Sequence, residues 1–267
     1  MKIAVTGKGG VGKTTLAATL ARLYAAEGRD TLAVDVDPDA NLGLALGFAP
    51  ERVENLTPVC KMTEFIAQRT GAGTNTYGKY FRINPKVDDI PETFSIVHEG
   101  VRLLVMGTVE VGGGGCVCPE HVILRRLLAH LIVGPDDVVI MDMEAGLEHL
   151  GRGTAGEMDS FIVVVEPGGR SVQTYHRVVQ LAADLGIHQV YVVANKIKDE
   201  ADELFIRSQI PAEALLGMVH FSPEAAQADR DGVSPYDAGG SVLQEITAIK
   251  ERIDAMRRKA TEGTNHA

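Results

Sequence analysis

Residues 2–15 read KIAVTGKGGVGKTT, where a short apolar run is followed at once by a glycine-rich loop and the start of a helical pattern. Residues 7–14, called the P loop below, fit the pattern G-x-x-x-x-G-K-[ST]. The glycines of such a loop let backbone N–H groups turn inward around phosphate oxygens, and the N-terminus of the following helix adds positive potential. The sequence therefore predicts a phosphate-binding loop between a strand and a helix.

Most positions of this loop have a predicted role. The Lys13 ammonium would reach the terminal phosphates of a nucleotide, and the Thr14 hydroxyl would bind Mg²⁺. The other predicted nucleotide contacts are Gly9, Gly10, Val11 and Gly12 in the loop and Thr15 directly after it.

The rest of the chain alternates short β-branched runs with helical patterns, which is typical of βαβ units. The expected strands are residues 2–6, 31–35, 101–106, 137–141, 160–165, 189–194 and 215–219. The expected helices are residues 13–27, 119–132, 171–185, 223–229 and 241–259, with shorter ones near 42–46 and 198–208. This order predicts an α/β fold: a single P-loop NTPase domain with a mostly parallel sheet flanked by helices.

The length of 267 residues allows one large domain or two small ones, and no change of composition marks a boundary. We expect one domain over residues 1–260 and a polar tail over residues 261–267. Residues 71–99 contain many glycines and prolines that break any periodicity, so we interpret them as an inserted segment.

The charge balance limits the kinds of partner. The chain has 26 Lys and Arg against 36 Asp and Glu, a formal net charge of -10, which argues against general nucleic-acid or anionic-membrane binding. The first apolar run is too short for a secretory signal, and no segment approaches the roughly 18 consecutive apolar residues of a membrane span. We therefore expect a cytoplasmic protein without nucleic-acid partners or stable membrane association.

Carboxylates follow two of the predicted strands, at the edge where open α/β sheets bind ligands. In the segment DVDPDAN, residues 35–41, a carboxylate would orient an attacking water or hold Mg²⁺ through a water, and Asn41 would cap the next helix. Asp142 ends the apolar run VVIMD as a Walker B aspartate does, and it is expected to face Mg²⁺. Glu144 beyond it is either an additional acid or an exposed side chain.

Asn195 follows the predicted strand VYVVA and is the candidate for recognising a purine base. Lys198 stands where an aspartate would indicate guanine, so ATP is favoured over GTP. The alternative role for Asn195 is to cap the helix near residues 198–208.

Four glycines, residues 112–115, precede the cysteine pair Cys116 and Cys118. Two thiolates supply half of a four-ligand metal site, and a two-fold dimer would supply all four. Zn²⁺ and Ni²⁺ both suit such a site, and His121 is either a further ligand or a packing residue. The alternative is a pair of unligated thiols or a strained disulfide. Cys60, far away in the sequence, is expected to be a small buried hydrophobe.

The second lysine of the P loop, Lys8, gives the run KGGVGKTT, which resembles the deviant Walker A ATPases, the MinD-like branch of the SIMIBI class. The group includes nitrogenase iron protein, the Min and Par positioning ATPases and nickel-inserting maturation factors. The resemblance implies that Lys8 acts on the nucleotide of a partner subunit and that ATP promotes dimerisation. It assigns the water-orienting role, with Mg²⁺ held directly or through water, to Asp37, with Asp39 as the alternative.

With the cysteine pair, the chain is similar to CooC-type ATPases, which help place nickel in carbon monoxide dehydrogenase, or to their relatives for acetyl-CoA synthase. The similarity covers the P loop, residues 35–39, 84–88 and 141–155 and the cysteine pair. It implies an ATP-hydrolysing homodimer that uses ATP/ADP and Mg²⁺, holds Ni²⁺ or Zn²⁺ between its subunits and serves such a nickel enzyme. Glu144 departs from the usual switch loop, and residues 71–99 have no assigned role.

Three other readings share parts of this pattern. A nitrogenase-type reductase would hold an iron–sulfur cluster between subunits by two well-separated cysteines, and a positioning ATPase would use a basic tail for a membrane or DNA. A third is an interaction module that binds nucleotide without turnover. The apolar spacing of residues 242–256 is better explained by a core-facing helix than by a membrane anchor.

Overall fold

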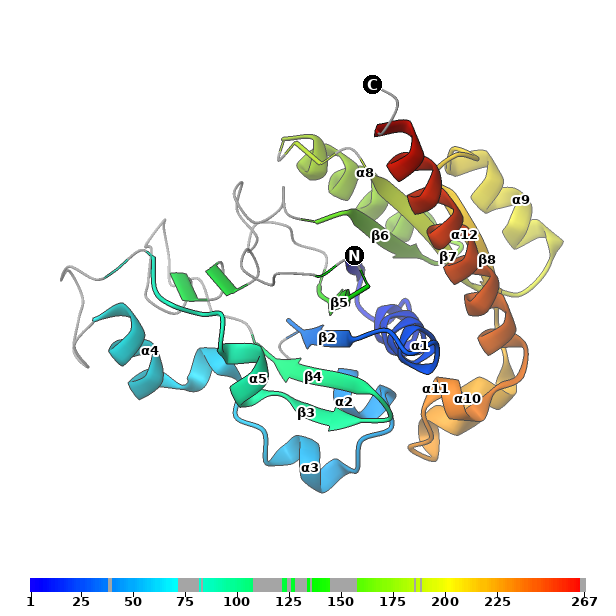
Figure 1. Cartoon of the computed structure of the whole chain (residues 1–267). Coiled ribbons are helices and arrows are strands. Elements are labelled where there is room, and N and C mark those ends of the chain that lie inside the picture. The colour runs from blue at the N-terminus through cyan, green and yellow to red at the C-terminus, as the bar shows by residue number, and fades with distance from the viewer. Residues whose placement is uncertain are drawn as a thin grey trace.

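The computed structural model describes residues 1–37, 40–71, 82, 84–107, 122–123, 126–127, 134, 136–144, 158–184, 186–187 and 189–264. Within them, eight strands form one sheet in the order β3-β4-β2-β5-β1-β6-β7-β8 (Figure 1). The strands are β1 (Lys2–Gly7), β2 (Thr31–Asp35), β3 (Ile96–His98), β4 (Val101–Val105), β5 (Val138–Asp142), β6 (Ser160–Val165), β7 (Val190–Ile197) and β8 (Leu215–His220). All neighbours are parallel except β3, which runs antiparallel to β4 at the edge.

Helices cover both faces of the sheet. They are α1 (Lys13–Ala26), α2 (Leu42–Ala45), α3 (Pro50–Glu54), the 3-10 turn η1 (Val59–Lys61), α4 (Thr63–Thr70), α5 (Ile90–Phe94), α8 (Gly169–Asp184), α9 (Glu200–Gln209), α10 (Pro223–Arg230), α11 (Pro235–Ala238) and α12 (Gly240–Thr264). Successive side chains of a strand point to opposite faces. Ile3 and Val5 accordingly join the core under α1, α2 and α12, whereas Ala4 joins the core under α4, α8 and α9.

The predicted α/β fold with a mostly parallel sheet is confirmed, and all seven predicted strands are present with small shifts at their ends. The prediction missed β3 and α5, which both lie in the segment 71–99, and outside that segment it also missed α3, η1, α4 and α11. β3 is only three residues long and forms through the turn at Glu99 and Gly100, both with positive φ, so it has no periodicity of its own to detect. The predicted boundaries of the domain, the inserted segment and the tail stay predictions.

Part of the predicted helix at residues 119–132 is helical in the structure, at residues 122–123 and 126–127. Its other residues lie outside the described ones. The same is true of Cys116, Cys118, His121 and Asp39, so their predicted roles stay predictions.

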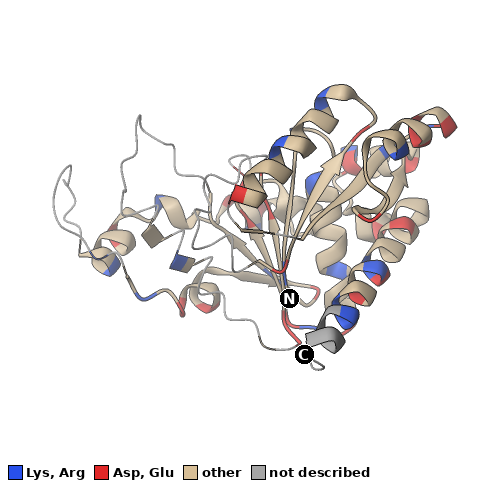
Figure 2. Ribbon diagram, turned by 90° about the horizontal axis from the view of Figure 1, so that it is seen from above, with Lys and Arg blue, Asp and Glu red and all other residues tan. Residues whose placement is uncertain are grey.

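The long helix α12 packs on β8 and α1. Its residues Val242, Ile246, Ile249 and Ile253 are buried, so the interpretation as a core-facing helix is confirmed. Both basic and acidic residues occur along its ribbon, coloured blue and red (Figure 2). In the part of the chain that the structure describes, no helix combines the length and apolarity needed to cross a bilayer.

Candidate nucleotide and magnesium site

The sheet brings the ends of four strands to one edge. β1 and β2 are both parallel neighbours of β5, and the register pairs Asp142 with Val5 on one side and with Asp35 on the other. β7 ends at the same edge, beyond β6. The loops after these strands therefore meet there, and the P loop lies among them, between β1 and α1.

Two glycines let the P loop approach its neighbours closely. At Gly7, with φ of 152°, a Cβ would lie 2.5 Å from the carbonyl oxygen of Val164 in β6. At Gly12, with φ of 96°, a Cβ would overlap the Nδ2 atom of Asn195. Any side chain at either position would push the loop away from the sheet, so glycine is required at both.

Lys13 and Thr14 begin α1 and point toward the end of β5. Lys13 is only 6% exposed although it is a lysine, and Thr14 donates a hydrogen bond of 2.6 Å from Oγ1 to Oδ2 of Asp142. A lysine this deeply buried needs negative charge nearby, which Asp142 supplies here and which phosphate would supply in a complex. The structure thus brings together three residues that the sequence assigned to phosphate and Mg²⁺.

The Asp142 carboxyl group has an unsatisfied oxygen. Its Oδ1 atom is buried and, among the described residues, is without a hydrogen-bond partner. Burial raises the pKa of Asp142 to about 6, against the opposing effects of the Thr14 hydrogen bond and the Lys13 charge, and the Asp37 charge raises it further. A hydroxyl and a carboxylate with an open buried oxygen are the hard donors that Mg²⁺ prefers, so the residues present fit that ion.

Asp35, to which the sequence interpretation gave no role of its own, has a structural role. It is buried and accepts hydrogen bonds from the backbone N–H groups of Leu42 (2.9 Å) and Asp37 (3.1 Å). Burial raises its pKa to about 7, and Asp142 adds to the rise while the two backbone bonds oppose it. Asp35 therefore fixes the entry to α2. The predicted cap by Asn41 is wrong, because its side chain makes no cap bond.

The remaining predicted catalytic groups lie nearer the surface. Asp37 is half-buried beside Asp142, and Lys8 is exposed together with Gly9 and Gly10. Glu144 is also exposed, and it contributes its backbone carbonyl, which accepts a hydrogen bond of 2.8 Å from the Thr6 hydroxyl. The roles predicted for Asp37 and Lys8 in hydrolysis stay predictions.

Asn195 lies against the P loop. Its Nδ2 donates to the carbonyl of Val11 at 2.8 Å, and its Oδ1 accepts from the backbone N–H of Lys196 at 2.9 Å. The alternative role as a helix cap is wrong, because Asp199 caps α9 by accepting from the N–H of Asp202. Base recognition by Asn195 stays a prediction.

Lys196 and Glu166 were given no role from the sequence. The Lys196 ammonium donates to the carbonyl of Gly10 at 2.5 Å and lies 3.8 Å from Glu166 at the end of β6. The available signal was the dipeptide Asn-Lys directly after a strand, which the sequence interpretation used only for its asparagine. Cys60, predicted to be buried, is half-buried in η1, close to Gly107.

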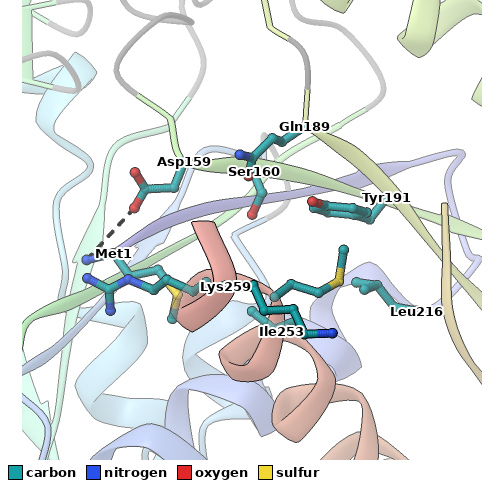
Figure 3. Close-up of a pocket in the computed structure, with 10 residues that line it drawn as sticks. Met1, Asp159, Ser160, Gln189, Tyr191, Leu216, Ile253 and Lys259 are labelled. Atoms are coloured by element: carbon teal, nitrogen blue, oxygen red, sulfur yellow. Dashed lines mark ion pairs between the residues drawn. The ribbon is translucent and has the colours of Figure 1, made fainter. Parts of the chain in front are cut away.

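A cavity of about 610 Å³ lies at the opposite, amino edge of the sheet (Figure 3). It is lined by side chains of β7, β8 and α12, among them Tyr191, Leu216 and Ile253, with Lys259 and Asp159 at its rim. None of the predicted site residues lines it. The predicted chemistry therefore belongs to the carboxyl edge and not to this cavity.

Comparison with known proteins agrees with this arrangement. The model of the CobQ/CobB/MinD/ParA nucleotide-binding domain family matches residues 2–236. The chain is 48% identical over 249 residues to the carbon monoxide dehydrogenase accessory protein CooC of Rhodospirillum rubrum, covering 93% of this chain and 94% of that protein. It is 45% identical over 252 residues to an uncharacterised ATP-binding protein of Methanocaldococcus jannaschii, covering 93% and 96%.

Among solved structures, the fold is similar to that of the septum site-determining protein MinD from Pyrococcus horikoshii, complexed with Mg-ADP. The two superpose with a TM-score of 0.64 at 22% identity, over 96% of this chain and 98% of that one. At this identity the likeness concerns the fold. Together with the family match and the two close relatives, it means that the chain belongs to the CobQ/CobB/MinD/ParA family of P-loop ATPases, in its CooC-type branch.

Proposed function

We propose that this chain is a dimeric ATPase that helps place nickel in a carbon monoxide dehydrogenase or a related acetyl-CoA synthase. The observation that carries the proposal is the 48% identity, over 93% of the chain, to a protein named as a carbon monoxide dehydrogenase accessory protein. The group formed by buried Lys13 and Asp142 with half-buried Thr14 supports the ATPase part, because it offers a cation to phosphate and an open carboxylate oxygen to a metal.

The chain's own residues divide the work of hydrolysis. Backbone N–H groups of the P loop would bind the phosphates, and Lys13 would bind the terminal ones. Thr14 and Asp142 would hold Mg²⁺, and Asp37 would hold it directly or through a water. When bound, Mg²⁺ neutralises charge that develops on the phosphates. Asp37, half-buried beside Asp142, would also orient the attacking water and accept its proton.

Dimerisation would complete the site. The exposed position of Lys8 suits a side chain that reaches into a partner subunit, where its charge would stabilise the phosphoryl group in transfer as an arginine finger does. Two copies would also bring together two pairs of Cys116 and Cys118, enough thiolates for one Ni²⁺ or Zn²⁺ ion. ATP binding would favour this dimer, and hydrolysis would release the metal or make the client accept it.

The test separates the two sites. Purified wild type, Lys8→Ala and the double variant Cys116→Ala with Cys118→Ala are compared for Ni²⁺ and Zn²⁺ binding, phosphate release and molecular mass with ADP or an ATP analogue. We expect Lys8→Ala to lose turnover and keep metal, and the double variant to lose metal and keep turnover. Cys60→Ala, a cysteine outside the proposed site, is the matched control and is expected to keep both.

Stoichiometric metal in the double variant would refute the assignment of the cysteines. Stoichiometric iron and sulfide in protein purified without oxygen would instead favour an iron–sulfur reductase of the nitrogenase type. A monomeric mass with the ATP analogue would contradict the role of ATP in dimerisation.

A further inference from the structure

Two neighbouring residues at the end of β7 hold two neighbouring carbonyl groups of the P loop. Lys196 donates from Nζ to the Gly10 carbonyl, and Asn195 donates from Nδ2 to the Val11 carbonyl. In the sequence, 186 positions separate Lys196 from Gly10, and 184 positions separate Asn195 from Val11. In the sheet β6 separates β7 from β1, so Lys196 reaches across the end of β6.

Because of peptide geometry, these two hydrogen bonds fix the direction of two peptide groups of the loop. In the described residues every peptide is trans, and in a trans peptide the C=O and the N–H point in opposite directions. The Gly10 carbonyl and the Val11 N–H belong to one peptide, so holding the carbonyl toward β7 turns the N–H into the loop. The same holds for the Val11 carbonyl and the Gly12 N–H.

The inward N–H of Val11 has only a weak acceptor in this structure. It reaches the Lys8 carbonyl at 3.4 Å, which is long for an N–H···O bond. A phosphate oxygen carries full negative charge and makes a shorter and stronger bond with the same donor. The hydrogen bonds from β7 therefore keep the Val11 N–H pointing into the loop, where it can donate to an anion.

Lys196 also has an unusual backbone conformation and a second partner. Its φ of 60° lies in the left-handed region, which is uncommon for residues other than glycine and costs free energy. Glu166, 3.8 Å from the ammonium, is 38% exposed, and Lys196 is 43% exposed. A pair this exposed contributes little to the stability of the fold. The hydrogen bond from Lys196 to the P loop points to a role in ligand binding instead.

We propose that Lys196 is a positioning residue for nucleotide binding, which holds the Gly10 carbonyl outward so that the P loop presents its N–H groups to phosphate, with Glu166 keeping the ammonium in place. The inference rests on the proposed use of the P loop for ATP. It predicts that Lys196 affects the affinity for ADP and ATP equally, because both nucleotides carry the phosphates that the loop binds.

The experiment is titration calorimetry of ADP with Mg²⁺ into wild type and four variants. Lys196→Met keeps the length of the side chain and removes its charge, and loss of a charge-assisted hydrogen bond is expected to weaken ADP binding about tenfold. Lys196→Arg keeps a cationic donor and is expected to stay within about threefold of wild type, whereas Lys196→Gly, which accepts the positive φ, is expected to be as weak as Lys196→Met. Glu166→Gln is expected to weaken binding by about twofold to threefold.

Two further readouts separate positioning from a structural role. The melting temperature of nucleotide-free Lys196→Met is expected to match that of wild type. In steady-state hydrolysis its KM for ATP is expected to rise about tenfold while kcat stays within about twofold, since the loop orientation affects bound ground state and transition state alike.

Wild-type ADP affinity in Lys196→Met or Lys196→Gly would overturn the inference. So would an arginine variant as weak as the methionine variant, or a fall of kcat at unchanged KM. Failure of the wild-type protein to bind ADP at all would instead contradict the proposed function, so the two failures are distinguishable.

Discussion

The two edges of the sheet differ in how their polar groups are arranged. At the carboxyl edge, Lys13, Thr14 and Asp142 are drawn together from α1 and β5, and Asp142 has a buried oxygen without a partner among the described residues. At the amino edge there is a cavity of about 610 Å³, but Asp159 at its rim is 59% exposed (Figure 3). Converging buried polar groups, rather than free volume, identify the site.

The strongest test of this comparison removes a cation from each edge. Lys13→Ala is expected to lower ATP hydrolysis by about 10³-fold or more, because the positive charge at the phosphates acts where charge develops in the transition state. Lys259→Ala, at the cavity, is expected to leave hydrolysis unchanged. Phosphate release at saturating ATP and Mg²⁺ measures both. Equal losses of ATP hydrolysis in the two variants would contradict the placement of the nucleotide site at the carboxyl edge.

A second test compares one carboxylate from each edge. Asp142→Asn is expected to lower hydrolysis about 10²-fold, because the proposed Mg²⁺ site would lose one of its carboxylates. The same change is expected to stabilise the nucleotide-free protein by on the order of 1 kcal/mol in EDTA at pH 7. The control, Asp159→Asn, replaces an exposed group and is expected to change the free energy of unfolding by less than about 0.5 kcal/mol.

The stabilisation follows from the sign of the pKa shift. Burial raises the folded-state pKa of Asp142 from 3.8 to about 6, so the folded protein holds this proton more tightly than the unfolded chain. Stability is then lost as pH rises from about 4 to about 6, and the loss is complete at pH 7. Asparagine does not titrate. Denaturant unfolding at pH 4 and pH 7 measures the effect, and an equal difference between wild type and Asp142→Asn at both pH values would contradict it.

The smallest effect is expected at an exposed group of the carboxyl edge, His220 at the end of β8. A hydrogen bond to Glu245 raises its pKa, the Glu245 charge and Glu203 add to the rise, and burial opposes it. Because the folded-state pKa is raised, the stabilisation is complete below the ordinary value of 6.5 and is lost as pH rises through the folded-state value. His220 is 45% exposed, so solvent screening limits the effect to a few tenths of a kcal/mol.

The measurement is denaturant unfolding of wild type and His220→Gln between pH 5.5 and pH 8.5. The advantage of wild type over the variant is expected at the acidic end and not at the alkaline end. A constant difference across this range would show that His220 does not titrate with its two glutamates. A change in the free energy of unfolding as large as that of Asp142→Asn would contradict the expectation that an exposed group contributes less than a buried one.

The sequence was informative where a short segment contains its own signal. The run of residues 31–35 predicted β2 with its observed ends, and residues 160–165 predicted β6 in the same way. Strands buried on both faces are mostly apolar, which makes them recognisable. β3 has three residues, none of them buried, and depends on its pairing with β4, so no pattern in the sequence could mark it.

The residues of the site likewise fall into those that a short sequence pattern revealed and those that only the structure revealed. The P loop pattern singled out Lys13 and Thr14, the end of an apolar run singled out Asp142, and the structure places these three residues together. Lys196 and Glu166 were missed, and Asp35 was given no role of its own. Lys196 and Glu166 act through contacts with a different strand or loop, which a list of side chains along the chain does not contain. The role of Asp35 depends on its burial and on the fold of the loop that follows it, which brings the N–H groups of Asp37 and Leu42 to its carboxylate.

The sequence by itself determined the class of fold, the phosphate-binding loop and the family, because each of these depends on residues that are close together in the chain. Only the tertiary structure decided that Asp35 fixes the entry to α2, that Asp142 keeps an open buried oxygen and that Lys196 holds the Gly10 carbonyl. The physical reason is that burial, a pKa and the direction of a carbonyl group are set by neighbours in space. For Lys196 and Gly10 those neighbours are 186 positions apart.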